Sequence, residues 1–566
     1  MKIDIALTPL RRFARFLNEE KKEVYAIYFY AILNGVVSLS LPLGIQAILN
    51  FILGGRISTS WILLVVVVGA GISFGGFLQI SQLYLTEKLQ QRIFTKAGFG
   101  FAYRLPRLKL DDLHDKHAPD LVNRFFDAIN LQKGMAKILI DFSAASIQVV
   151  FGLMLLAFYH PFFIIFGFVL ILLLILIFYF TSPQGMETSL KESTSKYKVA
   201  YWLEEIGRTM ATFKLAGNSK LPFMRVDKLL QSYVEFRNKH FAILIFQYKI
   251  LIAFKVLIVC SLLVAGSLLL INNEISIGQF VAAEIIIVLV VNSVEKLILT
   301  LETVYDTLTA TEKIGQILDL PVEKIEGTDK SLTSEFQGLE FKIKNVTYQS
   351  RDRQFKILDD VSLELSTGEK VILTGTSGSG KSTIMYLLAG LYSEYTGKIL
   401  VNGLPIETMN LDKFRSFIGD SLTHQSIFHG TIYENITLGK DVDDKQIREI
   451  IDLVGLKNYI YALPDDLETG LMPEGKGLSK KVISKIIMAR CLAGSPKALI
   501  LEDLFSYFDD DIKVRVGDYI MKGPWTTVMV SDDVELMKKS PRIIELKDGK
   551  ISFDGPSDAY FEYKNL

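Results

Sequence analysis

Six long apolar stretches dominate the first half of the chain. They lie near residues 24–53, 60–85, 138–160, 161–182, 244–272 and 277–303. Each is long enough to cross a hydrocarbon core about 30 Å thick at about 1.5 Å per residue. A single span must satisfy its own backbone hydrogen bonds in lipid, and these runs lack the alternation of barrel strands. We therefore predict six transmembrane helices.

The segments between these stretches differ in length and charge. The links at 54–60, 160–161 and 272–276 are short and contain one basic residue, Arg56. Segment 86–137 contains ten Lys or Arg, and segment 183–243 is similarly basic. Because basic residues gather on the cytoplasmic side of membrane proteins, we predict that both long segments and both chain ends are cytoplasmic.

Composition supports a membrane protein and excludes other classes. The chain of 566 residues is 50% hydrophobic, with a mean hydropathy of +0.31. Lys+Arg and Asp+Glu each number 62. This balance lacks the basic field of a nucleic-acid-binding protein, so we expect lipid and no nucleic acid among the partners. Two cysteines, Cys260 and Cys491, rule out a disulfide framework.

The pattern changes near both ends of the apolar region. Residues 9–22 (PLRRFARFLNEEKK) suit an interfacial helix or an ordinary basic flank of the first span. After Thr303 the chain takes up mixed αβ patterning. The expected domains are a cytoplasmic N-terminal segment at 1–22, a six-helix transmembrane domain with long cytoplasmic helical loops at 23–318, a linker at 319–337 and a nucleotide-binding domain at 338–566.

A glycine-rich motif carries the clearest chemistry. Residues 370–374 (KVILT) read as a buried strand, and IMYLLAGLY after the motif reads as a helix, so the pattern GxxxxGK[ST] has its required setting. Its backbone N–H groups would face phosphate oxygens, with Lys381 on the β- and γ-phosphates and Ser382 on magnesium. We therefore expect ATP and Mg²⁺ as cofactors. The expected nucleotide-binding residues here are Gly375, Thr376, Ser377, Gly378, Ser379, Gly380, Lys381, Ser382 and Thr383.

This arrangement resembles the ATP-binding-cassette exporter family over nearly the whole chain. Leu478-Ser479 stands where the LSGGQ signature of the family starts, and residues 498–503 match its apolar strand ending in two acids. Residues 430–436 and 506–509 match further family stretches. The resemblance implies an α-helical six-span membrane domain followed by an α/β P-loop domain. It also implies a half-transporter acting as a homodimer or as a heterodimer with another half-transporter, in a bacterial inner membrane with a cytoplasmic nucleotide domain.

Several positions depart from the family pattern. Thr423 falls where the family has a glutamine that senses magnesium. In the signature, Lys480 and Lys481 replace two glycines that allow close backbone approach to the γ-phosphate on the partner. The signature as it stands is Leu478, Ser479, Lys480, Lys481 and Val482.

The catalytic positions depart as well. The expected Asp-Glu pair is inverted to Glu502-Asp503, which shortens the general base and lengthens the metal-side acid. Asp532 stands at the switch histidine and cannot donate a proton when ionised. The adenine-stacking aromatic falls at Ser350, which leaves Tyr348 as its candidate substitute. We thus expect metal ligands among Ser382, Glu502 and Thr423, and weak catalytic groups at Glu502, Asp503 and Asp532.

Two functions are compatible with these residues. The first is an exporter half that binds ATP, couples closure of the nucleotide domains to alternating access, and hydrolyses slowly. The second is a catalytically impaired ATP-binding partner or regulatory subunit that does not itself pump. The transported substrate is not encoded legibly.

Ionisable residues inside spans are costly, and three of them draw attention. Lys255 and Glu295 lie at similar depths in the last hairpin and are expected to form an ion pair, with a substrate role as the alternative. Glu284 lies about 15 Å from the last turn, near the bilayer midplane. No cation of the hairpin matches its depth, so we predict that Glu284 faces an aqueous substrate pathway, with burial against another helix as the alternative.

Overall fold

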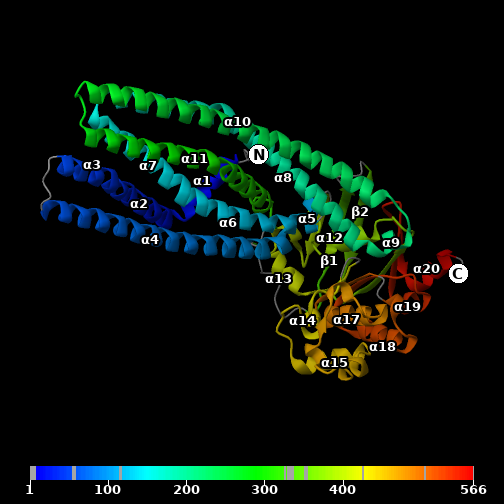
Figure 1. Ribbon diagram of the computed structural model, residues 1–566. Coiled ribbons are helices and arrows are strands. Elements are labelled where there is room, and N and C mark those ends of the chain that lie inside the picture. The colour runs from blue at the N-terminus through cyan, green and yellow to red at the C-terminus, as the bar shows by residue number, and fades with distance from the viewer. Residues whose placement is uncertain are drawn as a thin grey trace. The chain divides into compact units, whose positions relative to one another are not determined.

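The computed structural model describes residues 8–53, 59–113, 118–323, 327, 337–349, 355–422, 426–502 and 505–564. The chain divides into two compact units (Figure 1). The helical unit comprises residues 1–106 and 117–320, and the α/β unit comprises residues 107–116 and 321–566.

Among the described residues, six helices of the helical unit are long and apolar enough to cross a membrane, which confirms the predicted number. The spans are Lys21–Leu53, Thr59–Arg107, Leu121–Tyr159, Phe162–Arg208, Leu221–Ile271 and Ile277–Leu318. They are built from α2 (Lys21–Ser38), α3 (Ser40–Leu53), α4 (Thr59–Arg104), α5 (Ala118–Asn123), α6 (Asp127–Lys137), α7 (Ser143–Tyr159), α8 (Phe162–Arg208), α10 (Leu221–Ile271) and α11 (Ile277–Leu318).

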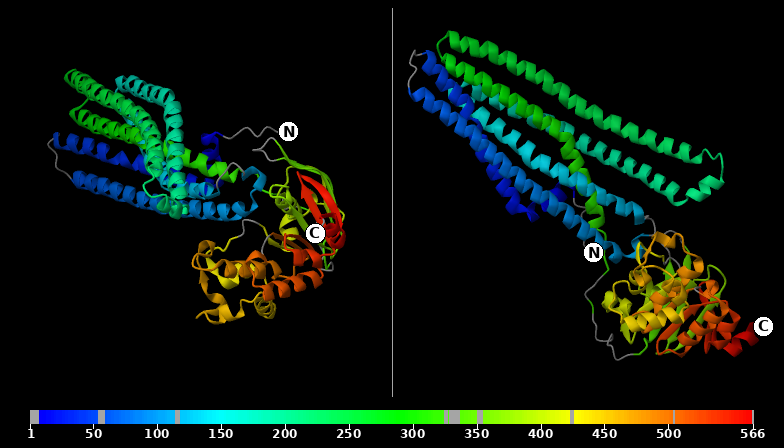
Figure 2. Two further views of the ribbon diagram at one scale, coloured as in Figure 1. Left: turned by 90° about the vertical axis from the view of Figure 1, so that its right-hand side faces the viewer. Right: turned by 60° about the horizontal axis from the view of Figure 1, so that its bottom comes forward.

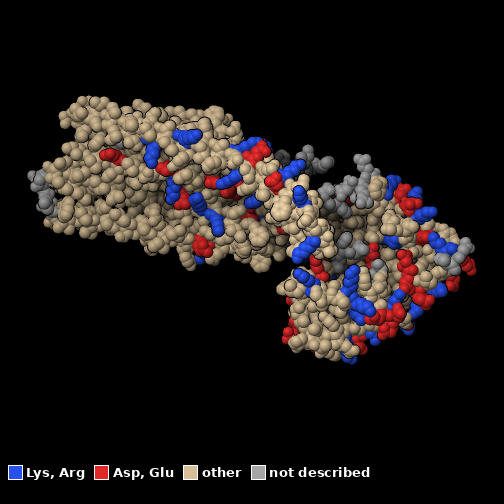
Figure 3. Space-filling model, turned by 45° about the vertical axis from the view of Figure 1, so that its right-hand side comes forward, with Lys and Arg blue, Asp and Glu red and all other residues tan. Residues whose placement is uncertain are grey.

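The long helices extend well beyond the apolar stretches. With 47 residues, α8 is about 70 Å long at the helical rise, more than twice the thickness of a hydrocarbon core. It runs beside α10, and the short helix α9 (Met210–Leu215) lies between the two in sequence (Figures 1 and 2). Figure 3 shows a large part of the helical surface almost without charge, as lipid contact requires, whereas both signs are interspersed over the α/β unit.

Helix α11 forms the centre of the helical unit. Half of the residues in the apolar 18-residue stretch of α11 are buried, whereas 11% are buried in the corresponding stretch of each of the first two spans. Small residues allow its neighbours to come close: a Cβ atom on Gly152 of α7 would lie 2.5 Å from the Val290 side chain. The predicted ion pair forms here, with Lys255 Nζ 3.0 Å from a Glu295 carboxylate oxygen. Pairing the two charges lowers the cost of placing each of them in a span.

The basic segment before the first span is helical. It forms α1 (Pro9–Glu19). Arg12 on this helix pairs with Glu312 of α11 at 3.5 Å and with Asp319 at 2.9 Å, while Leu10 remains 67% exposed. One face of α1 is therefore tied to α11, and its interfacial role stays a prediction.

The described part of the α/β unit contains two main sheets and a short pair of strands, β7 and β8. The six-stranded sheet has the order β12-β11-β3-β10-β9-β6, and the four-stranded sheet has the order β2-β1-β4-β5. The strands are β1 (Phe341–Gln349), β2 (Lys356–Leu365), β3 (Lys370–Gly375), β4 (Tyr395–Val401), β5 (Leu404–Pro405), β6 (Ile418–Ser421), β7 (Gly430–Thr431), β8 (Gly470–Leu471), β9 (Ala498–Glu502), β10 (Thr526–Val530), β11 (Arg542–Lys547) and β12 (Lys550–Pro556).

Helices of the α/β unit pack on these sheets through two large apolar clusters. They are α12 (Lys381–Leu388), α13 (Leu411–Ser416), α14 (Ile432–Thr437), α15 (Asp444–Leu453), α16 (Lys457–Tyr461), α17 (Lys480–Leu492), α18 (Asp510–Lys522), α19 (Val534–Lys539) and α20 (Ser557–Lys564). Strands β3, β10 and β9 are parallel, and Val530 is paired with both Leu373 and Glu502. Their carboxyl ends therefore meet at one edge, where ligands bind in open α/β sheets.

A piece of the first long loop belongs to the α/β unit. Leu108 forms a β-bridge with Val322, and the Arg107 carbonyl accepts a hydrogen bond from the Glu323 N–H at 2.9 Å. Asp111 is 3% exposed and accepts hydrogen bonds from the backbone and the hydroxyl of Ser393 at 2.7 and 2.9 Å. The predicted domain boundary at 338 did not include this segment, which joins the C-terminal unit through contacts distant in sequence.

Lys370 at the start of β3 predicts a pH effect on stability. Its ammonium is buried, donates to the Gly523 carbonyl at 3.0 Å and to the Trp525 carbonyl, and burial lowers its pKa from 10.5 to about 8. Between about pH 8 and 10.5 the unfolded chain therefore binds more protons than the folded chain. The free energy of unfolding should then rise with pH in this range.

The Lys370→Met variant should lose this rise. Denaturant unfolding of the full-length chain in detergent, followed by Trp525 fluorescence in a background with Trp61→Phe and Trp202→Phe, measures it. An equal pH slope in the variant would show that Lys370 titrates normally.

Candidate functional site

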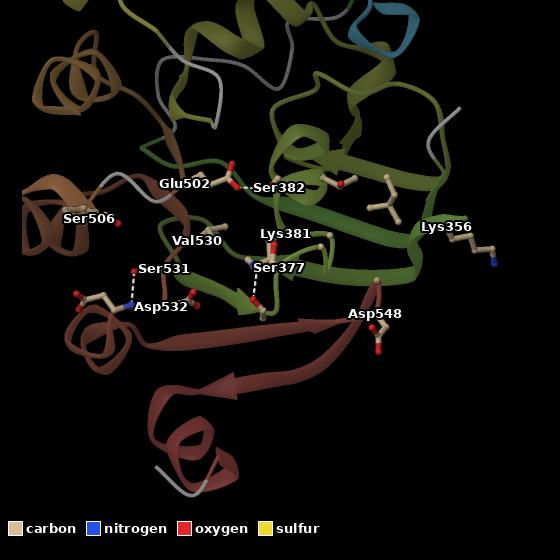
Figure 4. A pocket seen from close by; sticks show the side chains of 18 of the residues that line it. Lys356, Ser377, Lys381, Ser382, Glu502, Ser506, Val530, Ser531, Asp532 and Asp548 are labelled. Atoms are coloured by element: carbon tan, nitrogen blue, oxygen red, sulfur yellow. Dashed lines mark hydrogen bonds between the residues drawn. The ribbon is translucent and has the colours of Figure 1, made fainter. Parts of the chain in front are cut away.

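A cavity of about 990 Å³ opens where β3, β9 and β10 end (Figure 4). The glycine-rich loop forms one wall, and residues after β9 and β10 form another. Most residues predicted from the motif line it: Gly375, Ser377, Gly378, Gly380, Lys381, Ser382 and Thr383. The side chains of Thr376 and Ser379 do not line it.

The glycines are needed for the shape of this loop. Gly375, Gly378 and Gly380 have φ values of 137°, 80° and 103°, a region that other residues rarely adopt. A Cβ on Gly375 would also lie 2.1 Å from the Leu546 carbonyl oxygen. The loop leads directly into α12, so its N-terminal N–H groups face the cavity and favour an anion.

The two polar side chains after Gly380 have defined partners. Lys381 Nζ donates to the carbonyls of Gly375 and Thr376 at 2.6 and 3.0 Å. Ser382 Oγ forms a hydrogen bond of 2.5 Å with Glu502 Oε1, and Glu502 Oε2 is buried without a hydrogen-bond partner in the described part of the chain. A hydroxyl beside an unsatisfied carboxylate oxygen is an oxygen donor set of the kind that Mg²⁺ prefers.

The other altered positions are only partly described. Asp532 lines the cavity, and its carboxylate accepts a hydrogen bond of 2.9 Å from the Thr374 hydroxyl. It therefore presents a negative charge at the edge of β10, where the resemblance placed an imidazole. Asp503, Thr423 and Ser350 lie outside the described residues, so their predicted roles stay predictions.

The signature segment lies away from the cavity of its own chain. None of residues 478–482 lines it. Ser479 caps α17 by accepting the Val482 N–H at 3.3 Å. Lys480 Nζ lies 5.5 Å from the centre of the Tyr507 ring, so it contacts an aromatic face.

Lys481 is not a free charge in this structure. Its ammonium lies 2.5 Å from Asp509 Oδ1, and Lys485 lies 3.4 Å from Oδ2 of the same carboxylate. The Lys481 hydrogen bond lowers the pKa of Asp509, and the same bond raises the pKa of Lys481. Lys481 is bulkier than the glycine that it replaces in the family pattern, but its charge is balanced within the chain by Asp509.

The structure does not support Tyr348 as the stacking residue for a base. Its side chain is 3% exposed, its ring stacks on Tyr392 with centroids 5.0 Å apart, and its hydroxyl donates to Asp111 at 3.4 Å. It does not line the cavity. Phe355, which is 56% exposed and directly precedes β2, lines the cavity instead.

Sequence analysis also missed Lys513 and Asp533, which line the same cavity. Asp533 directly follows the predicted switch position, and Lys513 lies four residues beyond the matched stretch that ends at Asp509. No motif marks either residue, because only the fold brings α18 and the start of α19 to the end of β10.

Glu284 lies on the uncovered face of α11. The residue is exposed, while neighbouring Ala283 and Ile287 are buried at 2% and 1% exposure. Its carboxylate has no salt bridge or side-chain hydrogen bond with any described residue of the chain. An unpaired acid on an exposed face of a span fits a role in a water-filled pathway.

Six membrane-spanning helices joined to an α/β unit with a phosphate loop define a membrane-bound P-loop protein. Residues 24–294 match the family model described as "ABC transporter transmembrane region", and residues 358–506 match the model described as "ABC transporter". The chain therefore belongs to the ABC transporter family, as the motifs predicted.

Individual relatives agree with this assignment. The "ATP-dependent lipid A-core flippase" of Burkholderia orbicola (strain AU 1054) is 28% identical over 52% of this chain and 50% of its own length. The "Alpha-hemolysin translocation ATP-binding protein HlyB" of Escherichia coli O157:H7 is 31% identical over 50% of this chain and 40% of its own. The chain thus spans about half the length of these curated relatives.

A solved structure supports the fold over nearly the whole chain. "Structure of a bacterial Atm1-family ABC exporter with ATP bound" superposes with a TM-score of 0.82 and covers 96% of this chain and 97% of its own, at 18% identity. At this identity the similarity establishes the fold.

Proposed function

We propose that the chain is one half of an ABC exporter that binds ATP with Mg²⁺ and hydrolyses it slowly. The carrying observation is the cavity at the carboxyl edge of the parallel sheet, lined by the phosphate loop, Lys381 and Ser382. The matched relatives, whose names include an ATP-dependent flippase and a translocation ATP-binding protein, support ATP use and transport.

Magnesium would be held by Ser382 and Glu502. The hydroxyl, and the Glu502 oxygen that lacks a partner among the described residues, are the donors available to it. The bound ion would neutralise phosphate charge. The Ser382 hydroxyl can donate to Glu502 and still offer an oxygen lone pair to the ion, so the hydrogen bond between them is compatible with magnesium binding.

Slow hydrolysis is supported by the altered catalytic side chains together. Asp532 offers a carboxylate where a proton donor is expected, and Thr374 holds it in place. A displacement of about 1 Å in a catalytic group can lower the rate about a hundredfold. Two lysines at the start of α17 fill the space that glycines would leave for a phosphate of the partner site.

The second function, an ATP-binding subunit that does not pump, is favoured by the distribution of the changes. The chain is altered both around its own phosphate loop and in its signature. In a homodimer or a heterodimer, therefore, every composite site receives at least one altered component. In a heterodimer, the site at the partner's phosphate loop would retain the partner's own acids.

ATP binding and turnover, measured on one preparation of full-length protein, test the proposed function. We expect saturable, Mg²⁺-dependent ATP binding with slow turnover. Absence of saturable binding would refute it, and turnover that appears only with an added half-transporter would favour the regulatory subunit.

We further propose that the chain lies in a bacterial inner membrane with its nucleotide domain in the cytoplasm, and that Glu284 faces a substrate pathway. Single-cysteine variants in a background without Cys260 and Cys491 test both statements. Asn218→Cys, at the exposed tip between α8 and α10, should react with an impermeant thiol reagent only after cells are permeabilised.

Glu284→Cys should react with a charged, water-soluble reagent in membrane vesicles. Val264→Cys is the matched control, because Val264 is 63% exposed on α10 and lies equally far from the α10–α11 turn. Labelling of Asn218→Cys in intact cells would overturn the topology. Equal protection of both span positions would place Glu284 against lipid or protein.

A further inference from the structure

The cavity has two distinguishable ends. In Figure 4, Lys356 and Asp548 lie to one side of Ser377 and Lys381, while Ser506, Ser531 and Asp532 lie to the other. Phe355 precedes Lys356, so the first end offers an aromatic face. The second end adjoins Ser382 and Glu502, where the terminal phosphate of a bound nucleotide would lie.

This terminal-phosphate end is rich in carboxylates. Glu502, Asp532 and Asp533 all line it. These three carboxylates would repel the oxygens of a bound phosphate. The repulsion would be strongest for the third phosphate of ATP, because that phosphate would lie closest to them. Beyond Lys381 of the loop, Lys513 is the one cation among the described residues that line this end.

Lys513 is held in place by a residue with a fixed position. Asp533 uses Oδ1 to cap α19, accepting the Leu536 N–H at 3.0 Å, and its Oδ2 pairs with Lys513 Nζ. The side chains of Lys513 and Asp533 are only 23% and 25% exposed. The ion pair therefore anchors the ammonium at the cavity wall.

The ammonium retains the capacity to bind a ligand. A lysine carries three N–H donors, and Asp533 engages one of them. The remaining donors can reach phosphate oxygens without breaking the ion pair. Hydrogen bonds between ionised groups are about twice as strong as neutral ones, so such a contact would contribute measurably to affinity.

We propose that Lys513 binds the terminal phosphate of ATP and makes the site discriminate ATP from ADP. This inference rests on the proposed binding of ATP. Lys513 approaches from α18 and supplies the positive charge that Asp532, at the end of β10, cannot supply. The contact exists only when a third phosphate is present, so its loss affects the triphosphate alone.

The test compares ATP and ADP affinities of the full-length protein in detergent with Mg²⁺, by displacement of a fluorescent nucleotide analogue. Lys513→Met should weaken ATP binding about tenfold and change ADP binding less than about twofold, as expected for one charge-assisted hydrogen bond. Lys513→Arg should keep most of the ATP affinity. Lys522→Met, which removes an exposed lysine from the same helix, should leave both affinities unchanged.

Each other outcome counts against the proposal. Equal losses of ATP and ADP affinity in Lys513→Met would show that Lys513 maintains the shape of the cavity or the fold and does not contact the third phosphate. In that case Lys513→Arg, which keeps the ion pair, would restore both affinities together. Unchanged ATP affinity would remove Lys513 from the site. Failure of the wild type to bind either nucleotide would instead overturn the proposed function itself, so the two failures are distinguishable.

Discussion

Restoring five of the altered positions of the nucleotide site should raise ATP turnover at least about a hundredfold, because misplaced catalytic groups cost about that factor. The variant combines Lys480→Gly, Lys481→Gly, Glu502→Asp, Asp503→Glu and Asp532→His. In a homodimer it corrects both halves of each composite site at once. Turnover under saturating Mg-ATP, compared with the wild type, measures the gain.

Three of these substitutions change contacts that the structure describes. Glu502→Asp shortens the side chain that now bonds Ser382 directly, and Asp532→His replaces a carboxylate held by Thr374 with a proton donor. Lys481→Gly opens the start of α17 but also releases Asp509, which keeps only its longer contact with Lys485 at 3.4 Å.

A variant with only the two lysine substitutions is the matched control. It should gain little, since the acids and the switch position remain altered. If the five-position variant bound ATP like the wild type and still did not turn over faster, the altered residues would not be the cause of slow hydrolysis.

Replacing Lys381 by alanine should weaken ATP binding about a hundredfold, since charge-assisted hydrogen bonds contribute about 1.5–3 kcal/mol each. Lys381 Nζ lies over the loop carbonyls of Gly375 and Thr376, and its ammonium can turn to phosphate oxygens in the cavity. Calorimetric titration of the full-length protein with ATP measures the loss.

Lys398→Ala is the control for the loss of one positive charge, because Lys398 is exposed on β4 and does not line the cavity. It should bind ATP like the wild type. Equal affinities in Lys381→Ala and Lys398→Ala would place the nucleotide somewhere other than the glycine-rich loop.

The parts of the molecule that could be predicted from the sequence are those whose structure depends on the surrounding lipid or on residues close in sequence. Lipid requires continuous apolar helices, so the six spans could be recognised without tertiary information. The phosphate loop combines a strand, glycines with positive φ and a helix start in one short segment. Its position in the fold follows from neighbours in sequence.

The parts that sequence could not predict depend on pairing between distant residues. Tyr348 shares the buried face of β1 with Val346, and register shifts on both sides of it in the pairing with β2 obscure a simple alternation. Its partners Asp111 and Tyr392 come from other parts of the chain. The base-stacking hypothesis for Tyr348 failed for this reason.

The ion pairs near the site also could not be predicted, because each joins residues that are distant in sequence. Lys481 and Asp509 are 28 residues apart, and Lys513 and Asp533 are 20 apart, yet both pairs form ion pairs beside the catalytic segments. Sequence identified Lys481 as an unusual residue but not its partner. It gave no sign of Lys513, because a single lysine in an amphipathic helix is ordinary.

Steady-state ATP turnover of the wild-type chain in lipid bilayers, at saturating Mg-ATP, tests most directly whether this ABC transporter half binds nucleotide but hydrolyses it slowly. We predict saturable ATP binding with turnover at least about a hundredfold below the ordinary enzymatic value of about 10 per second. With a competent half-transporter added, any residual turnover should depend on the partner's acids. Turnover near about 10 per second by the unmodified chain alone would contradict the proposal.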